Sequence, residues 1–241
     1  MGVIMDKMLK NQEKTNKYDN IVSGVFAPLF LYYVIHNVAV IGGLAILELA
    51  VGKVEMLNLG EEGLFYVRTV VRMAGMALGG VAVYPYYVRE QAKNKKKSLS
   101  LEIGTALVLG GALLSLGINY LFAVTGFIES SAGYQQVAEV QFALPLWMAF
   151  IFYGILSPIV EEMVFRGIVC NRLCQNTSHV MGIVGSALLF GVFHGNVVQM
   201  LYGTLMGVVM GYVYGRYHNL TAPILVHSAA NIAIYVITYF F

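Results

Sequence analysis

The chain has 241 residues, of which 58% are hydrophobic and 12% are charged, and its formal net charge is +2. A soluble domain carries about 25% charged residues, so this composition excludes an ordinary soluble protein. Five stretches contain no Asp, Glu, Lys or Arg over at least 19 residues: 21–47, 103–128, 142–160, 197–215 and 220–241. A helix needs about 20 apolar residues to cross a bilayer, so each stretch is long enough to do so.

Together with two less apolar stretches, these runs predict seven helical segments. In chain order they are 21–51, 64–88, 101–128, 142–169, 180–195, 197–217 and 220–241. We therefore expect an all-α fold, a polytopic transmembrane helix bundle of about seven (six to eight) spans. The chain divides into an N-terminal tail (1–20), N-terminal transmembrane helices (21–140) and a C-terminal membrane core (141–241). About twenty polar residues precede the first apolar run, which does not fit a cleavable signal peptide.

Positive charges gather in alternate loops and predict how the chain lies in the membrane. The tail and the loop after the second segment contain Lys7, Lys10, Lys14, Lys17, Arg89, Lys93, Lys95, Lys96 and Lys97, and Arg172 and Arg216 follow the fourth and sixth segments. The opposite loops are mostly acidic, with Lys53 beside Glu55, Glu61, Glu62, Glu129 and Glu139. Lys and Arg favour the cytoplasmic side, so the N-terminus is expected in the cytoplasm.

A stripe of small residues marks the sixth segment, with Gly203, Gly207, Gly211 and Gly215 at every fourth position. Such a stripe lets another helix approach closely in lipid, so we interpret it as a packing surface. His36 stands alone in the first segment and is assigned to packing or a local hydrogen bond.

Polar side chains inside the last membrane segments are costly in hydrocarbon and need an explanation. The fourth segment contains E-E-M-V-F-R at 161–166, the fifth ends F-G-V-F-H-G-N with His194, and the seventh contains H-S-A-A-N at 227–231. Glu162 and Arg166 are four residues apart and can pair on one helix face, as can His227 and Asn231. Glu161 points about 100° away from Glu162 and is free for another task.

The depth of these groups is the stronger argument for a common site. At 1.5 Å per residue, Glu161, His194, His227 and Asn231 lie about 14–22 Å from the inner end of their helices. The hydrocarbon core is about 30 Å thick, so three helices place polar groups near one mid-membrane level. A single histidine can equally serve as interhelical glue, but two carboxylates, two histidines and an asparagine at one depth indicate a catalytic site.

Two chemistries fit this set of residues. A carboxylate beside an imidazole can activate water, while a second histidine with an asparagine donates hydrogen bonds to an oxyanion. Alternatively, Glu161, His194 and His227 could hold Zn²⁺ with an open position for water. Both hydrolyse an acyl bond, and the sequence lacks the Gly-x-Ser-x-Gly and His-Glu-x-x-His motifs of commoner hydrolases. The spacing of His227 and Asn231 favours the metal-free chemistry, because asparagine is a poor zinc ligand.

At these positions the sequence resembles the CPBP intramembrane proteases, also called the CAAX-protease-like or Abi family. The matching motifs are E-E-x-x-x-R at 161–166, F-x-x-x-H at 190–194 and H-x-x-x-N at 227–231. The resemblance covers roughly residues 150–234, and its bacterial members are the most similar. It implies proteolysis of a membrane-associated peptide or protein in a bacterial cell membrane.

The resemblance also implies roles for individual residues. Glu161 and His194 would activate the water, His227 and Asn231 would form the oxyanion site, and Glu162 with Arg166 would support them. It leaves open whether the family uses a divalent metal such as zinc, and it does not imply prenylated substrates. Nucleic acid is not expected as a partner, and the oligomeric state is not predicted.

Two other functions fit the same residues. A proton- or ion-coupled transporter could use the carboxylates and histidines as a relay, but we see no internal repeat typical of such transporters. A non-catalytic immunity or scaffold protein could retain the fold, although the intact set of four polar residues argues against it.

Overall fold

The computed structural model describes residues 21–53, 60–91 and 95–240, and within them the secondary structure is helical. The tail assigned to 1–20, with its four lysines, lies outside the described residues, as do Lys93 and Glu55. The elements are η1 (Val22–Phe26), α2 (Ala27–Lys53), α3 (Gly60–Gln91), α4 (Leu101–Val124), α5 (Ala132–Phe142), α6 (Leu146–Ala149), η2 (Phe150–Leu156), α7 (Ser157–Glu162), η3 (Met163–Cys170), α8 (Asn171–Asn176), α9 (His179–Val192), α10 (Val197–Tyr217) and α11 (Thr221–Phe240), where η denotes a π-helical stretch.

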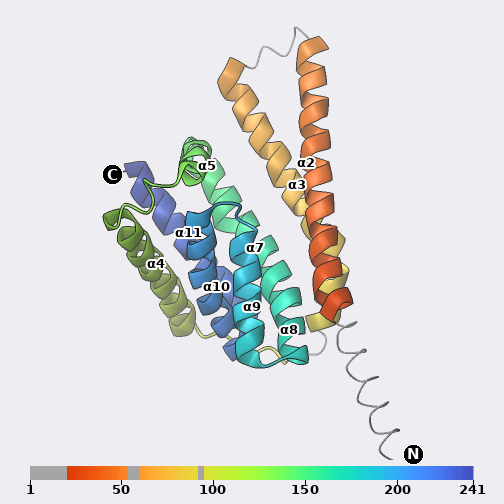
Figure 1. The fold of residues 1–241 in the computed structure, drawn as a ribbon, viewed down its shortest axis with the longest axis vertical. Coiled ribbons are helices and arrows are strands. Elements are labelled where there is room, and N and C mark those ends of the chain that lie inside the picture. Colours follow the sequence, from red (N-terminus) through yellow and green to blue (C-terminus); the bar gives the residue numbers. More distant parts are fainter. Residues whose placement is uncertain (1–20, 54–59, 92–94, 241) are drawn as a thin grey trace, which may run out of the picture.

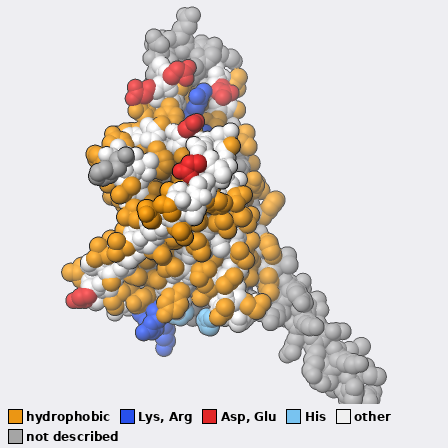
Figure 2. Space-filling view, turned by 60° about the vertical axis from the view of Figure 1, so that its left-hand side comes forward, with side chains coloured by type: hydrophobic (Ala, Val, Ile, Leu, Met, Phe, Trp, Pro, Cys, Tyr) orange, Lys and Arg blue, Asp and Glu red, His pale blue; other side chains and the backbone are white. Residues whose placement is uncertain are grey.

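The prediction of a polytopic all-α bundle is confirmed. In the described part of the chain, six helices are long and apolar enough to cross a membrane: Ser23–Ala50, Gly60–Gln91, Leu101–Val124, Leu146–Asn176, Val197–Tyr217 and Thr221–Phe240. The segment predicted at 180–195 is the 14-residue α9, which is shorter than a spanning helix. On the face shown in Figure 2, hydrophobic side chains cover the middle of the bundle and charged side chains lie nearer its two ends.

One helix was not predicted from the sequence. Residues 129–141 were expected to be a connecting loop, but α5 occupies Ala132–Phe142. The helix begins after Ser131, whose side chain accepts a hydrogen bond from the backbone N–H of Tyr134 and so caps it. It is too short and too polar for a membrane span, and its residues were therefore assigned to the loop.

The long helix Leu146–Asn176 is the central element of the bundle. Its parts α6, η2, α7, η3 and α8 run on without a break and pack against α2, α3, α9, α10 and α11. Pro158 lies near its middle and lacks the N–H that would continue an α-helical ladder. The π-helical turn η2 directly precedes this proline, and such turns are frequent at functional sites. The carboxylates Glu161 and Glu162 follow within one turn.

Three pairs of helices pack closely around this central element: α2 with α3, α4 with α11, and α9 with α10. Figure 1 shows α2 and α3 as a long hairpin that rises beside the bundle and diverges from it towards the end occupied by α5. The predicted packing surface of α10 is confirmed at three of its four glycines, because Gly203, Gly207 and Gly211 lie against α9 or the turn after it, whereas a Cβ on Gly215 would meet nothing within 4 Å. A Cβ on Gly207 would lie 3.0 Å from the Cα of Ala187, and one on Gly211 would lie 2.9 Å from Ile183.

The crossing of α4 and α11 depends on a second close approach, at Gly111. A Cβ at this position would lie 2.6 Å from the carbonyl oxygen and 2.9 Å from the Cα of Val226. These are backbone atoms, which cannot turn aside as a side chain can. Since Val226 precedes His227, the spacing of α4 and α11 also fixes where that histidine lies.

We expect Gly111→Ala to destabilise the protein by about 1–3 kcal/mol, because its methyl group would push the backbone of α11 away from α4. Gly110→Ala is the matched control, since a Cβ there meets nothing within 4 Å. It should change the free energy of unfolding by less than about 1 kcal/mol, in the stabilising direction. Thermal unfolding of both variants in detergent measures the difference. Equal stability of the two would contradict the close approach.

Candidate active site

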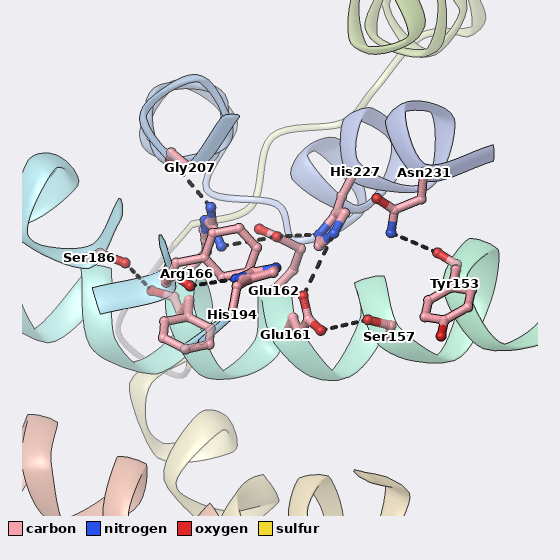
Figure 3. A network of polar contacts seen from close by, with 12 residues as sticks. Tyr153, Ser157, Glu161, Glu162, Arg166, Ser186, His194, Gly207, His227 and Asn231 are labelled. Carbon is pink, nitrogen blue, oxygen red and sulfur yellow. Dashed lines mark hydrogen bonds and ion pairs between the residues drawn. The ribbon is translucent and has the colours of Figure 1, made fainter. Parts of the chain in front are cut away.

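The polar residues singled out in the sequence come together in the middle of the bundle (Figure 3). Glu161 and Glu162 end α7, His194 follows α9 in the turn before α10, and His227 and Asn231 lie on α11. The turn at His194 is possible because Gly195 adopts a positive φ of 76°. Three separate helices thus deliver these side chains to one place.

A fully buried ion pair forms the inner part of this network. Arg166 Nη1 lies 3.1 Å from Glu162 Oε1, and both side chains have no exposed surface. The predicted pairing of these residues four positions apart is therefore confirmed. A buried charge is strongly destabilising without its partner, so the stability of the fold depends on keeping the two side chains together.

Arg166 also connects the central helix to α10. Its Nη2 donates a hydrogen bond of 3.3 Å to the carbonyl oxygen of Gly207, and its guanidinium lies 4.4 Å from the ring centre of Phe190. A Cβ on Gly207 would lie 3.3 Å from Nη2, so the absence of a side chain there leaves room for this contact. Arg166 is thereby fixed by a carboxylate, a carbonyl and an aromatic face.

His227 lies between the two glutamates and is held by the inner one. Its Nδ1 is 2.8 Å from Glu162 Oε1, whereas its Nε2 is 3.7 Å from Glu161 Oε2. Because Glu162 is also paired with Arg166, its carboxylate accepts and His227 Nδ1 donates. Nε2 is left facing Glu161 without a close hydrogen bond to it.

Glu161 has a different environment from its neighbour in the sequence. Its side chain retains 17% of its surface, and its Oε1 accepts a hydrogen bond of 2.6 Å from the hydroxyl of Ser157. Ser157 lies one turn earlier on the same helix, so it sets the direction of the carboxylate. Two adjacent glutamates therefore have separate tasks, one inside the protein and one at the cavity.

His194 is oriented by its own backbone. Its Nδ1 lies 2.8 Å from the carbonyl oxygen of Phe190, and a carbonyl only accepts, so Nδ1 carries the proton. In the neutral ring, Nε2 then has a free lone pair. Asn231 is oriented in a similar way, because its Nδ2 donates a hydrogen bond of 2.9 Å to the carbonyl oxygen of Tyr153. The amide retains a second N–H for another acceptor.

A cavity of about 170 Å³ gives access to these groups, and its wall includes Glu161, His194, His227 and Asn231. The rest of the wall is rich in amide and hydroxyl side chains from α4, α5 and α10, including Asn119, Tyr134, Gln141, Gln199 and Tyr202. Tyr134 lies on α5 outside the spans, and burial raises the pKa of its hydroxyl, which therefore stays protonated as a donor. The cavity has room for water and for a polar segment of substrate.

The three residues of the alternative zinc site are not gathered into a metal-binding cluster in this structure. Within residues 21–53, 60–91 and 95–240, no three His, Cys, Asp or Glu side chains are placed to hold a metal ion. Glu161, His194 and His227 share a cavity, and Nδ1 of each histidine is engaged by a protein acceptor, which leaves Nε2 of both rings available to a ligand.

Two contributors to the site were missed in the sequence. Ser157 lies one helical turn before Glu161, and its hydroxyl donates a hydrogen bond to that carboxylate. Its position beside Pro158 is the sequence feature that could have indicated this role. The carbonyl of Tyr153 is free to accept a hydrogen bond from Asn231 because it lies in the π-helical stretch η2. No pattern in the sequence predicted this stretch. His36, which was assigned to packing or a local hydrogen bond, does stack on Tyr32, and it also lies in the wall of a second cavity with Glu161 and His194.

Comparison with known proteins agrees with the motifs. Residues 143–233 match the family model described as Type II CAAX prenyl endopeptidase Rce1-like. The matched segment contains all of α7, η3, α9 and α10 and the polar residues of α11. The resemblance of the site region to the CPBP, or CAAX-protease-like, family is therefore confirmed.

Similar proteins are found in bacteria. The chain is 29% identical over 148 residues to a protein of Bacillus subtilis named "Putative membrane peptidase YdiL", a match that spans 59% of either chain. It is 25% identical over 130 residues to the UPF0177 protein YxdF of Lactococcus lactis, which covers 52% of this chain and 72% of that protein. The chain thus spans little more than half of the Bacillus relative. No solved structure matches significantly.

We expect Arg166→Ala to lower the free energy of unfolding by about 3–5 kcal/mol, because it leaves the Glu162 carboxylate buried without a counterion. Arg216→Ala is the control, since Arg216 is an exposed residue at the end of α10. The double variant Glu162→Gln/Arg166→Met removes both charges and should recover part of the loss. Thermal unfolding in detergent measures all three. If Arg166→Ala unfolds like Arg216→Ala, the ion pair does not stabilise the fold.

Proposed function

We propose that this protein is an intramembrane endopeptidase, which hydrolyses a peptide bond of a membrane-associated peptide or protein. The supporting observation is that Glu161, His194, His227 and Asn231 line one cavity inside a helix bundle whose site region matches a family of membrane endopeptidases. Glu161 and His194 activate the attacking water, and His227 and Asn231 donate hydrogen bonds to the oxyanion.

The water is bound between the Glu161 carboxylate and Nε2 of His194. Its oxygen attacks the peptide carbonyl carbon while Glu161 takes one proton from it, which is general base catalysis by a group within hydrogen-bond reach. The carbonyl oxygen becomes an oxyanion. The C–N bond then breaks, and the leaving nitrogen receives the proton from Glu161. A carboxylic acid and an amine are the products, and no other reactant is needed.

The oxyanion accepts hydrogen bonds from Asn231 and, when His227 carries both protons, from its Nε2. The first is available because Nδ2 of Asn231 uses one N–H for the carbonyl of Tyr153 and keeps the other. The second is directed by Glu162, whose carboxylate holds Nδ1 of His227 and leaves Nε2 on the side of Glu161. Donors fixed in advance by the protein stabilise the transition state without reorganisation, and removal of one typically costs about 10²–10³ in turnover.

A peptide-library cleavage assay on purified protein tests this proposal. Glu161→Gln keeps the size of the side chain but removes the base, so turnover should fall by about 10²–10⁴. Glu139→Gln is the matched control, because Glu139 is exposed on α5 and away from the cavity. Mass spectrometry of the products identifies the cleaved bond. No cleavage by the wild-type protein, or equal cleavage by Glu161→Gln, would contradict the proposal.

The same assay after thorough chelation addresses the metal. If Glu161 and His194 activate the water without a metal, turnover should survive chelation. Loss of turnover that zinc restores, with one zinc per active chain that disappears in His194→Ala and His227→Ala, would assign these residues to a metal instead.

We further propose that the protein resides in a bacterial cell membrane with the cavity open to the extracytoplasmic side. Figure 2 shows several Glu side chains towards one end of the bundle, with a smaller basic patch among them, and a second group of Lys and Arg side chains at the other end. At the basic end, Lys97 donates hydrogen bonds to the carbonyls of Arg216 and Tyr217, and Gly24 at the start of the first span lies beside Arg172. The positive-inside rule places this end, and with it the N-terminus, in the cytoplasm.

The cavity lies towards the acidic end, because α5 forms part of its wall. Labelling of single cysteines with a membrane-impermeant maleimide tests this, in a background where Cys170→Ala and Cys174→Ala remove the native thiols. Gln136→Cys on the exposed face of α5 should react in intact cells, and Lys96→Cys only after permeabilisation. The opposite pattern would reverse the orientation and would leave the proposed chemistry untouched.

A further inference from the structure

A second cavity, of about 280 Å³, lies on the other side of the central helix. It is formed between the α2–α3 hairpin and the region where η3 meets the end of α9. Aromatic side chains make up much of its wall, among them Tyr33 from α2 and Phe165 and Phe193 from the opposite side. His36 and Asn37 of α2 add polar groups. Half of the residues in this wall lie outside residues 143–233, so the family match assigns them no role.

The two cavities have Glu161 and His194 in common. The side chains proposed to activate water therefore stand between an amide-rich cavity on one side and an aromatic cavity on the other. An extended peptide advances by about 3.3 Å per residue. The residues on the two sides of a bond held at Glu161 therefore extend away from Glu161 in opposite directions. The arrangement offers each direction its own cavity.

His36 is held in this second cavity in a position to bind such a peptide. Its ring stacks on that of Tyr32 with centroids 5.9 Å apart and planes at 19°. A Cβ on Gly79 would lie 3.2 Å from the Cβ of His36, so α3 closes in on the residue from behind. Nδ1 of His36 is buried and has no hydrogen-bond partner in the described part of the chain. A buried polar atom without a partner is unfavourable, and a peptide N–H or C=O would supply one.

We propose that this cavity binds the substrate on one side of the scissile bond, with Nδ1 of His36 bonded to a peptide group and the aromatic wall around an apolar side chain. The inference rests on the proposed proteolysis. It names the substrate class, a peptide that is apolar or aromatic on one side of the cleaved bond and polar on the other. His36 is a positioning residue, because it contacts the substrate away from the reacting atoms.

The test uses a nine-residue peptide that the wild-type protein cleaves, and a copy in which the apolar residue beside the cleaved bond is serine. His36→Phe keeps an aromatic ring for Tyr32 but removes the nitrogen. It should raise KM about 3- to 10-fold, the size of one lost hydrogen bond, and leave kcat within about twofold. Ile41→Phe is the matched control, because Ile41 is an exposed apolar residue one turn further along α2.

Binding without turnover is measured in the Glu161→Gln background, where the dissociation constant of the cleavable peptide should rise by the same factor in Glu161→Gln/His36→Phe. The serine peptide should bind more weakly than the parent, and the His36 substitution should still add its effect. Unchanged KM and Kd in His36→Phe, with the wild type active, would overturn the role of His36. Absence of cleavage by the wild type would instead remove the proposed function and this inference with it.

Photo-crosslinking tests the two directions separately. A benzoylphenylalanine at position 193 reports on the aromatic cavity, and one at position 134 reports on the amide-rich cavity. With the peptide labelled at either terminus, the two positions should capture opposite ends. Capture of the same end at both positions, or none at 193 while 134 reacts, would show that the peptide occupies only the first cavity.

Discussion

The buried ion pair of Glu162 and Arg166 is the interaction on which the rest of the site depends. Two charges lie where neither retains any exposed surface, so neither can lose its partner without a large cost. The pair fixes α10 through the carbonyl of Gly207 and fixes α11 through Nδ1 of His227. An ion pair within one turn of the central helix thus sets the positions of the helices α10 and α11.

The adjacent carboxylates show how one turn of helix can separate structure from chemistry. Glu162 points into the protein, where its Oε1 is engaged by both Arg166 and His227. Glu161, about 100° around the helix, meets a cavity and is directed by the hydroxyl of Ser157. If both faced the cavity, their like charges would repel each other, and neither would orient His227. The rotation between neighbouring residues avoids this without any additional element.

The sequence predicted the contacts that follow from helix geometry. The pairing of Glu162 with Arg166 and the convergence of His194 and His227 at one depth required only the rise and repeat of an α-helix. It could not predict contacts that arise when distant segments pack. The carbonyl of Tyr153 reaches Asn231 only because Pro158 and the π-helical η2 displace the local backbone. Likewise, the single His36 carried no spacing pattern, and its proximity to Glu161 and His194 follows from the packing of the α2–α3 hairpin.

The position of Glu161 and His194 between two cavities has a consequence for specificity. The groups proposed to perform the chemistry lie in the segment that matches the family model, whereas much of the second cavity is built by α2 and α3, which the family match does not include. Changes in the hairpin can therefore alter which peptide binds without disturbing the ion pair that orients His227. In this proposal, substrate choice and bond hydrolysis are carried by different helices, which meet at one glutamate and one histidine.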